Sequence, residues 1–159
     1  MIIPFNFVHV FHPEASPVEN ALVLRRLLDC LTGLNVDYLQ HHRDTPALYK
    51  SGVRYRRQEC WECIPTLFER KWGDCKSLAC ALAAEYIMTG IPARTVFRWK
   101  VNQEPGGNDW TMFHILVQCP GGFEDPSKVL GMGKDENAKY YRNDGSVMAC
   151  DNAGIYSLR

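Results

Sequence analysis

The middle of the chain carries a helix pattern followed at once by strand patterns, and this order limits the folds available. Apolar residues recur at helical spacing over residues 75–86. Strand patterns follow near 93–101 and 112–119, and the sequence PGG at 120–122 signals a tight turn before a return strand at 123–125. Strands joined by a tight turn are antiparallel, and an apolar helix face must be buried against another layer. We therefore predict an α+β fold, with this helix packed on an antiparallel sheet of about four to six strands.

The N-terminal third predicts a strand, a helix and a long loop. Residues 2–11 are rich in Ile, Phe and Val, as strands are. The sequence SPVE at 16–19 combines a capping serine, a proline at the first helical position and a glutamate that completes a capping box. Apolar residues then keep one face as far as Gly33, a common stop residue, so we predict a helix over 17–32. Residues 35–61 lack periodicity, and a loop of this length usually lines a site.

Length and charge exclude several classes of protein. A chain of 159 residues has the usual size of one domain and can bury a core without disulfide bonds. Lys and Arg together number 18, and Asp and Glu together also number 18, so the net charge is zero. Nucleic-acid and anionic-membrane partners favour a basic surplus, and neither is expected here. One basic cluster, RYRR at 54–57, is diluted by Glu59 and Glu62. We interpret it as a solvated face, with contact to a substrate or partner as the alternative.

The N-terminus and the cysteines indicate a reducing compartment. The first apolar stretch is broken by Pro4, Asn6 and His9 and has no Lys or Arg before it, so it does not resemble a secretory signal. No segment approaches the roughly 20 apolar residues that a membrane span needs. The seven cysteines are an odd number, which favours free thiols over a disulfide framework. We therefore expect a cytoplasmic protein.

Three residues form a candidate catalytic set. Cys75 follows the expected N-cap residue Asp74 and lies in the first helical turn, where unpaired N–H groups and the helix dipole favour a thiolate. His114 interrupts an otherwise apolar strand, where an imidazole needs a polar partner. In the predicted hairpin, Asp125 falls directly opposite His114 or one diagonal step away. A thiol, an imidazole and a carboxylate can serve as nucleophile, general base and the group that orients the base.

These residues lie in three sequence boxes, namely GDCKSLA (73–79), FHILV (113–117) and FEDPS (123–127). In type and order the boxes resemble the Cys, His and Asp boxes of the transglutaminase-like superfamily. This resemblance implies a papain-like fold. The segments 48–59 and 124–132 resemble small members encoded in bacteriophage and prophage genomes. The resemblance covers about residues 46–132, within a single domain predicted over 1–159.

The resemblance implies a cysteine-dependent enzyme that acts through a thioester intermediate and needs no cofactor. The chain is far shorter than the eukaryotic transglutaminases, lacks room for their accessory β-domains and shows no acidic calcium-loop pattern. Hydrolysis by a peptidase or amidase is therefore favoured over cross-linking. The alternatives are acyl transfer and a non-enzymatic phage structural or interaction module. The expected partner is a protein, a peptide or a small amide. The expected location is the host cytoplasm or a virion, and the oligomeric state stays open.

The lining of the site is predicted less sharply. A substrate groove is expected along four aromatic residues, with ordinary core packing as the alternative: Tyr55, Trp61, Trp72 and Trp110. A backbone N–H at the helix start is well placed for an oxyanion hole. The side chain that completes this hole is Gln58, Glu69 or Trp61, and the sequence does not choose among them.

The remaining cysteines and histidines have plain interpretations. Cys60 and Cys63 have the spacing of half a zinc site or a redox pair, but no second pair follows, so we interpret them as packing thiols and expect no metal. A redox or metal-binding protein is the alternative. The histidines at 41–42 are interpreted as loop surface. Cys30 and Cys80 lie on the apolar sides of their predicted helices and are expected in the core.

Overall fold

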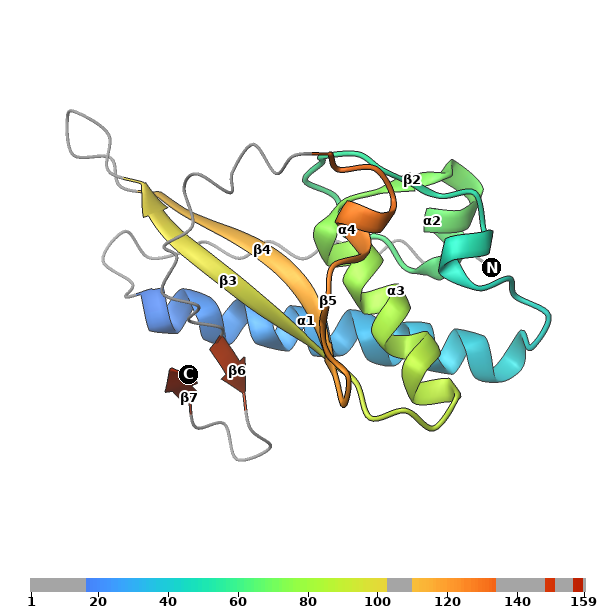
Figure 1. The fold of residues 1–159 in the computed structure, drawn as a ribbon, viewed down its shortest axis with the longest axis horizontal. Helices are drawn as coiled ribbons and strands as arrows, with labels where there is room; N and C mark the ends of the chain where they lie inside the picture. Colours follow the sequence, from blue (N-terminus) through green and yellow to red (C-terminus); the bar gives the residue numbers. More distant parts are fainter. Residues whose placement is uncertain (1–16, 103–109, 134–147, 151–155, 159) are drawn as a thin grey trace.

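A computed structural model describes residues 17–102, 110–133, 148–150 and 156–158 (Figure 1). The expected strand at 2–11 lies outside these residues. None of the described helices is long and apolar enough to span a membrane. In chain order the elements are α1 (Pro17–His41), the 3-10 helix η1 (Leu48–Lys50), β1 (Arg54–Tyr55), α2 (Ile64–Arg70), β2 (Trp72–Gly73), α3 (Cys75–Met88), β3 (Arg94–Asn102), β4 (Trp110–Cys119), β5 (Gly122–Glu124), α4 (Pro126–Val129), β6 (Met148–Cys150) and β7 (Tyr156–Leu158).

The main sheet has five antiparallel strands in the order β5-β4-β3-β6-β7. Strands β3 and β4 form the long predicted hairpin, in which Phe97 pairs with Ile115. The chain then turns back, and Val117 of β4 pairs with Glu124 of β5. Helix α3 packs on β4, so the predicted α+β fold with a helix on an antiparallel sheet is confirmed. A separate pair of short parallel strands, β1 and β2, leads directly into α3.

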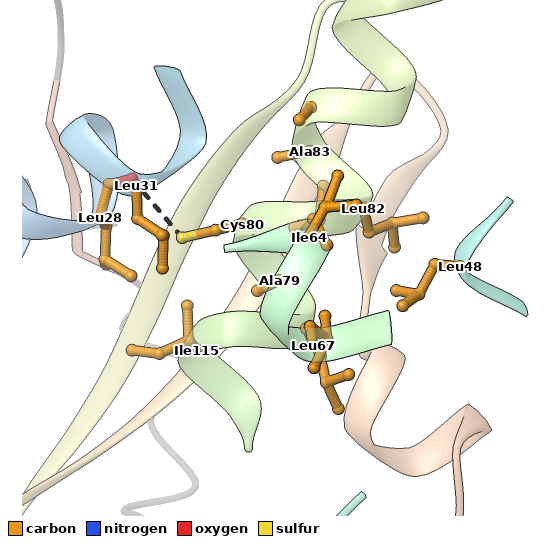
Figure 2. Close-up of a cluster of buried hydrophobic side chains, with 14 of the residues drawn as sticks. Leu28, Leu31, Leu48, Ile64, Leu67, Ala79, Cys80, Leu82, Ala83 and Ile115 are labelled. Atoms are coloured by element: carbon orange, nitrogen blue, oxygen red, sulfur yellow. Dashed lines mark hydrogen bonds between the residues drawn. The ribbon is translucent and has the colours of Figure 1, made fainter. Parts of the chain in front are cut away.

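Helix α3 forms the centre of the core. The eight consecutive residues 77–84 are all buried, so the helix has no solvated face along this stretch. We expected one apolar stripe; the helix is instead surrounded, as a helix that is apolar on all sides must be. Figure 2 shows the side chains that pack around it, which come from α1, η1, α2 and β4: Leu28, Leu31, Leu48, Ile64, Leu67 and Ile115.

The first helix is longer than predicted. Helix α1 continues through the exposed Gly33 and ends at His41, so the predicted end at 32 is wrong. The extra turns bury Asn35 completely and leave Leu39 8% exposed, which extends the core-facing side of the helix. The Asn35 Oδ1 accepts a hydrogen bond of 2.8 Å from the N–H of Ile64 at the start of α2. Tertiary contacts of this kind outweigh the cost of about 1 kcal/mol for one glycine inside a helix.

Gly73 is required for close packing rather than for an unusual backbone. Its φ lies outside the left-handed region, so its backbone conformation does not itself require glycine. A Cβ at this position would lie 2.3 Å from Cδ1 of Leu67, a side chain that is fully buried. The strand that leads into α3 can therefore approach α2 only because residue 73 has no side chain.

We expect Gly73→Ala to lower the free energy of unfolding by about 1–3 kcal/mol, because the added methyl group overpacks a closed core. Urea denaturation measures this change. The matched control is Gly33→Ala, where no atom lies within 4 Å of the added Cβ, and this change should stabilise α1 by up to about 1 kcal/mol. Equal stability of Gly73→Ala and the wild type would contradict the packing argument.

Candidate active site

Cys75 is the first residue of α3 and is partly exposed. The predicted N-cap is confirmed, because the buried Asp74 accepts a hydrogen bond of 3.3 Å from the N–H of Ser77. Burial raises the pKa of Asp74. The positive charge of Lys76, which forms an ion pair with this carboxylate, opposes the rise. The partly exposed sulfur of Cys75 therefore lies at the start of the central helix, next to the Asp74 cap.

His114 lies in β4 and is only 5% exposed. Its Nε2 is 2.9 Å from Oδ2 of Asp125, the residue that directly follows β5. The pairing of Val117 with Glu124 sets Asp125 in register with Leu116, which is one diagonal step from His114 on the same face. The return of the hairpin thus brings the carboxylate to the imidazole.

The Asp125 carboxylate also begins helix α4. While Oδ2 contacts His114, Oδ1 accepts hydrogen bonds from the N–H groups of Ser127 at 3.1 Å and Lys128 at 3.3 Å. Both oxygens are held, so the carboxylate has little freedom to rotate away from the imidazole. Although burial alone would raise the pKa of Asp125, the hydrogen bond to His114 and these contacts lower it below its usual value.

The electrostatics of His114 link it to both other residues. Burial of the imidazole favours its neutral form, but hydrogen bonds with Asp125 and with Cys75 outweigh this effect and raise the pKa of His114 to about 9. A histidine with this pKa is protonated at neutral pH. The arrangement holds a positive charge between the sulfur and the carboxylate, and it can stabilise a thiolate on Cys75.

A segment that precedes α2 covers the first turn of the nucleophile helix; we call residues 56–62 the covering segment. The Nζ of Lys76 donates to the backbone oxygen of Gln58 at 3.0 Å. The N–H of Glu62 donates to Oγ of Ser77 at 3.1 Å. Lys76 and Ser77 directly follow the candidate nucleophile in the chain, so these bonds fix the covering segment relative to the sulfur.

The covering segment carries two of the three candidates for the oxyanion hole. The Nε2 of Gln58 already donates to Oε2 of Glu62 at 2.6 Å. Trp61 is 38% exposed, and its ring centroid is 5.7 Å from Nζ of Lys76. The third candidate, Glu69, is exposed on α2. The N–H of Cys75 belongs to the first helical turn, where backbone donors have no partner within the helix.

A second hydrogen-bonded group anchors the strand that ends at Asp125. The carboxylate of Glu124 accepts hydrogen bonds from the hydroxyl groups of Tyr49 and Tyr86, which come from η1 and α3. The hydrogen bond to Glu124 raises the pKa of Tyr86 to about 12, and burial raises that of Tyr49 further. We did not predict these residues. Only the position of Glu124 beside Asp125 in the sequence could have indicated them.

The predicted substrate groove receives no direct support. The ring of Trp72 lies 4.6 Å from the guanidinium carbon of Arg56 and 5.5 Å from that of Arg70, so it is engaged by other protein groups. Tyr55 is half-buried against the core, and the side chain of Trp110 lies outside the described residues. An open pocket occurs at the opposite end of α3, where its lining includes Ile87, Ile91, Pro92 and Cys119. The groove along these aromatic residues stays a prediction.

The other cysteines differ in their surroundings. Cys80 is fully buried as expected, and its Sγ donates to the backbone oxygen of Leu28 (Figure 2). The prediction for Cys30 is wrong, because this residue is exposed on the outer side of α1. Cys60 is exposed, and Sγ of Cys63 is 3.8 Å from Oγ1 of Thr66. Among the residues that the structure describes, no three His, Cys, Asp or Glu side chains gather in a metal-binding group.

Comparison with known proteins gives one match. The family model of the transglutaminase-like superfamily matches residues 37–125, which is 89 of the 159 residues and therefore more than half of the chain. This range begins within α1 and ends at Asp125, so it contains Cys75 and His114 as well. No curated protein and no solved structure matches the chain significantly.

The pKa values of the site predict how stability changes with pH. Folding raises the pKa of His114 from 6.5 to about 9, so its interactions stabilise the fold fully below pH 6.5 and are lost as the pH rises through 9. Folding lowers the pKa of Asp125 from 3.8, so its stabilisation is present above this value and is lost at lower pH.

We therefore expect the stabilisation that His114 and Asp125 contribute to be highest between pH 3.8 and 6.5 and to fall by on the order of 2 kcal/mol toward pH 9.5. Urea denaturation at pH 6 and pH 9.5 measures this difference. His114→Gln is the control, because it removes the titrating imidazole. Burial raises the pKa of Glu85 to about 7 in both proteins, so the part of the decline that His114 causes is the difference between the wild type and this variant. A wild-type stability that does not change over this range would show that His114 is not coupled to its partners.

Proposed function

Because the chain belongs to the transglutaminase-like superfamily, whose members are generally cysteine-dependent amide hydrolases and transferases, we propose that it hydrolyses a peptide or amide bond. In this proposal Cys75 is the nucleophile, His114 is the general base and Asp125 orients the imidazole. The observation that carries the proposal is the 2.9 Å contact between Nε2 of His114 and Asp125, in a histidine that also bonds with Cys75.

The first half of the reaction forms a thioester. Since Asp125 holds Nε2 of His114, the other ring nitrogen, Nδ1, is the one that serves the thiol. The proton of Cys75 passes to this nitrogen and gives the thiolate–imidazolium pair that the raised pKa of His114 favours, and the sulfur then attacks the carbonyl carbon of the substrate. As the tetrahedral intermediate collapses, the bond from carbon to nitrogen breaks. The imidazolium returns the proton to the leaving amine.

The second half of the reaction releases the acyl group. Water enters the place of the amine and gives a proton to Nδ1 of His114 while its oxygen attacks the thioester carbon. The bond between sulfur and carbon breaks, which leaves a carboxylic acid and restores the thiol. A primary amine in the place of water would give acyl transfer by the same steps, so the nature of the acceptor separates the two activities.

Charge that develops on the carbonyl oxygen needs hydrogen-bond donors. The N–H of Cys75 is the nearest candidate, because the first turn of a helix leaves its donors unpaired and carries the positive end of the dipole. Removing one such donor in enzymes of this kind costs about a hundredfold to a thousandfold in kcat. The covering segment carries Trp61 to the same turn, and it is our second candidate.

The biological setting follows only from sequence resemblance. The similarity of residues 48–59 and 124–132 to small phage and prophage members leads us to propose that this chain is of that type.

A non-enzymatic module would be free to lose its hydrogen-bonded histidine and aspartate, whereas here both are buried or half-buried and paired. This pairing is the reason that we favour an enzyme.

We expect Cys75→Ala to abolish the hydrolysis of peptide mixtures incubated in ¹⁸O-labelled water, with incorporation of ¹⁸O into new carboxyl groups detected by mass spectrometry. His114→Ala should lower the rate by about a hundredfold to ten-thousandfold, as loss of a general base does. Cys30→Ala, which removes an exposed thiol on α1 outside this set, is the matched control and should keep full activity. Products that carry an added primary amine instead of ¹⁸O would favour acyl transfer. Activity that survives in Cys75→Ala would overturn the proposal.

A further inference from the structure

A group of exposed cations lies on the elements that adjoin the candidate active site. We call it the basic rim, and it comprises Arg54, Arg56, Arg57, Lys71 and Lys128. These residues come from three parts of the chain, namely β1 with the two residues that follow it, the end of α2, and α4. We interpreted the first three as a solvated face from the sequence. Their place in the fold indicates a more specific role.

Strand β1 joins the two halves of the site. On one side, the N–H of Arg56 donates to the backbone oxygen of Gly73 at 2.8 Å, two residues before Cys75. On the other side, the N–H of Tyr55 donates to the backbone oxygen of Leu130 at 2.9 Å, five residues after Asp125. The rim arginines therefore lie between the strand that delivers the nucleophile and the helix that begins at the carboxylate. Figure 1 shows β2, α4 and the first turn of α3 together at this end of the molecule.

Two buried carboxylates near the site, those of Glu62 and Asp74, do not neutralise the rim. Glu62 has a side chain that is 2% exposed, and it pairs with Arg70. Asp74 is likewise buried and pairs with Lys76. Both of these pairs are internally balanced, and neither involves a rim residue.

Among the described residues of these elements, two exposed carboxylates, Glu59 and Glu69, accompany the five rim cations. Of these cations, Lys128 also lies 4.0 Å from Oδ2 of Asp125, and Nζ of Lys71 donates to the backbone oxygen of Ser51. Within the part of the chain that the structure describes, no carboxylate forms an ion pair with Arg54, Arg56 or Arg57. The whole chain has zero net charge, so this local excess of positive charge is a segregation of charge at the site.

Arg56 is held ready to bind an anion. Its guanidinium carbon lies 4.6 Å from the ring centroid of Trp72, three residues before the nucleophile. A guanidinium group that stacks by its face keeps the N–H groups on its edge available for a carboxylate, and less side-chain entropy is lost when it binds. Trp72 thus serves the site by positioning this arginine, in addition to any contact with substrate.

We propose that the substrate is an acidic polypeptide segment, in which Asp or Glu side chains beside the reacting amide bind to Arg56 and Arg57 of the basic rim. This inference rests on the proposed function, because it names the class of substrate for the same site. Carboxylates on both sides of the reacting bond would meet the rim, since Lys128 lies at the far side of the site with its Nζ 4.0 Å from Oδ2 of Asp125.

Alkylation of Cys75 tests the local charge without any substrate. The probes are iodoacetate, which is anionic, and iodoacetamide, which is neutral; the readout is the ratio of their rate constants at Cys75, located by mass spectrometry. By Coulomb's law in water, two unit charges about 10 Å from a reacting atom change the rate for an anion by about fourfold at low salt. We expect Arg56→Gln/Arg57→Gln to lower the ratio by about this factor, and 0.5 M NaCl to remove the difference. Arg26→Gln, an exposed charge on α1, is the matched control and should leave the ratio unchanged.

Peptide binding to the Cys75→Ala protein gives a second readout that does not depend on turnover. Labelled peptides with Glu around a central Gln should bind more tightly by fluorescence anisotropy than the same peptides with Gln in place of Glu. This preference should disappear when Arg56→Gln and Arg57→Gln are added. An unchanged alkylation ratio in the double variant, or equal or undetectable binding of both peptides, overturns the acidic-substrate proposal. A Cys75 whose alkylation does not depend on His114 would instead contradict the proposed function, and peptide binding would still decide the preference for acidic segments.

Discussion

The burial of helix α3 on all sides is the constraint on which the rest of the structure depends. Residues 77–84 are enclosed by α1, α2, η1 and the sheet, so the helix cannot shift without opening the core. Its first residue, Cys75, is therefore fixed in position although it is partly exposed. A nucleophile gains from this arrangement, because a rigid element holds the reacting atom in one place while the helix start supplies unpaired donors.

Asp125 connects the site to the remainder of the fold. One carboxylate oxygen contacts His114 in the sheet, while the other caps α4, and the chain after α4 bonds to β1 through Leu130. Glu124, held by two tyrosines, fixes the strand that ends at this residue. Each residue of the proposed triad thus lies in or beside a different element, and hydrogen bonds that also position the basic rim connect these elements. The hydrogen bonds that connect these elements therefore also position the side chains of the candidate site.

Local signals explain which parts of the fold were predictable. The Asp74 cap, the apolar run after it and the PGG turn are properties of short segments, and each gave the correct element. The end of α1 was missed because it depends on the burial of Asn35 and its bond to Ile64, a contact between residues 29 positions apart. Helix α2 was missed for a similar reason, since it is short and packs through Ile64 and Leu67.

The candidate site shows the same division. Cys75, His114 and Asp125 could be named because a helix start, a polar residue in an apolar strand and a hairpin register are visible in the sequence. Lys76 and Gln58, which fix the covering segment, could not be named because their bond joins a side chain to a distant backbone oxygen. The basic cluster was visible, but its place beside Cys75 depends on the pairing of β1 with β2.

The central claim is that Cys75, His114 and Asp125 behave as one coupled unit. Nuclear magnetic resonance of ¹⁵N-labelled imidazole nitrogens, titrated from pH 5 to 10, tests it most directly, with His114 assigned among the five histidines by His114→Gln. The account predicts an apparent pKa for His114 near 9 in the wild type and lower values in Cys75→Ala and in Asp125→Asn, because each variant removes a group that raises this pKa. A His114 that titrates near 6.5, or that titrates equally in all three proteins, would contradict it.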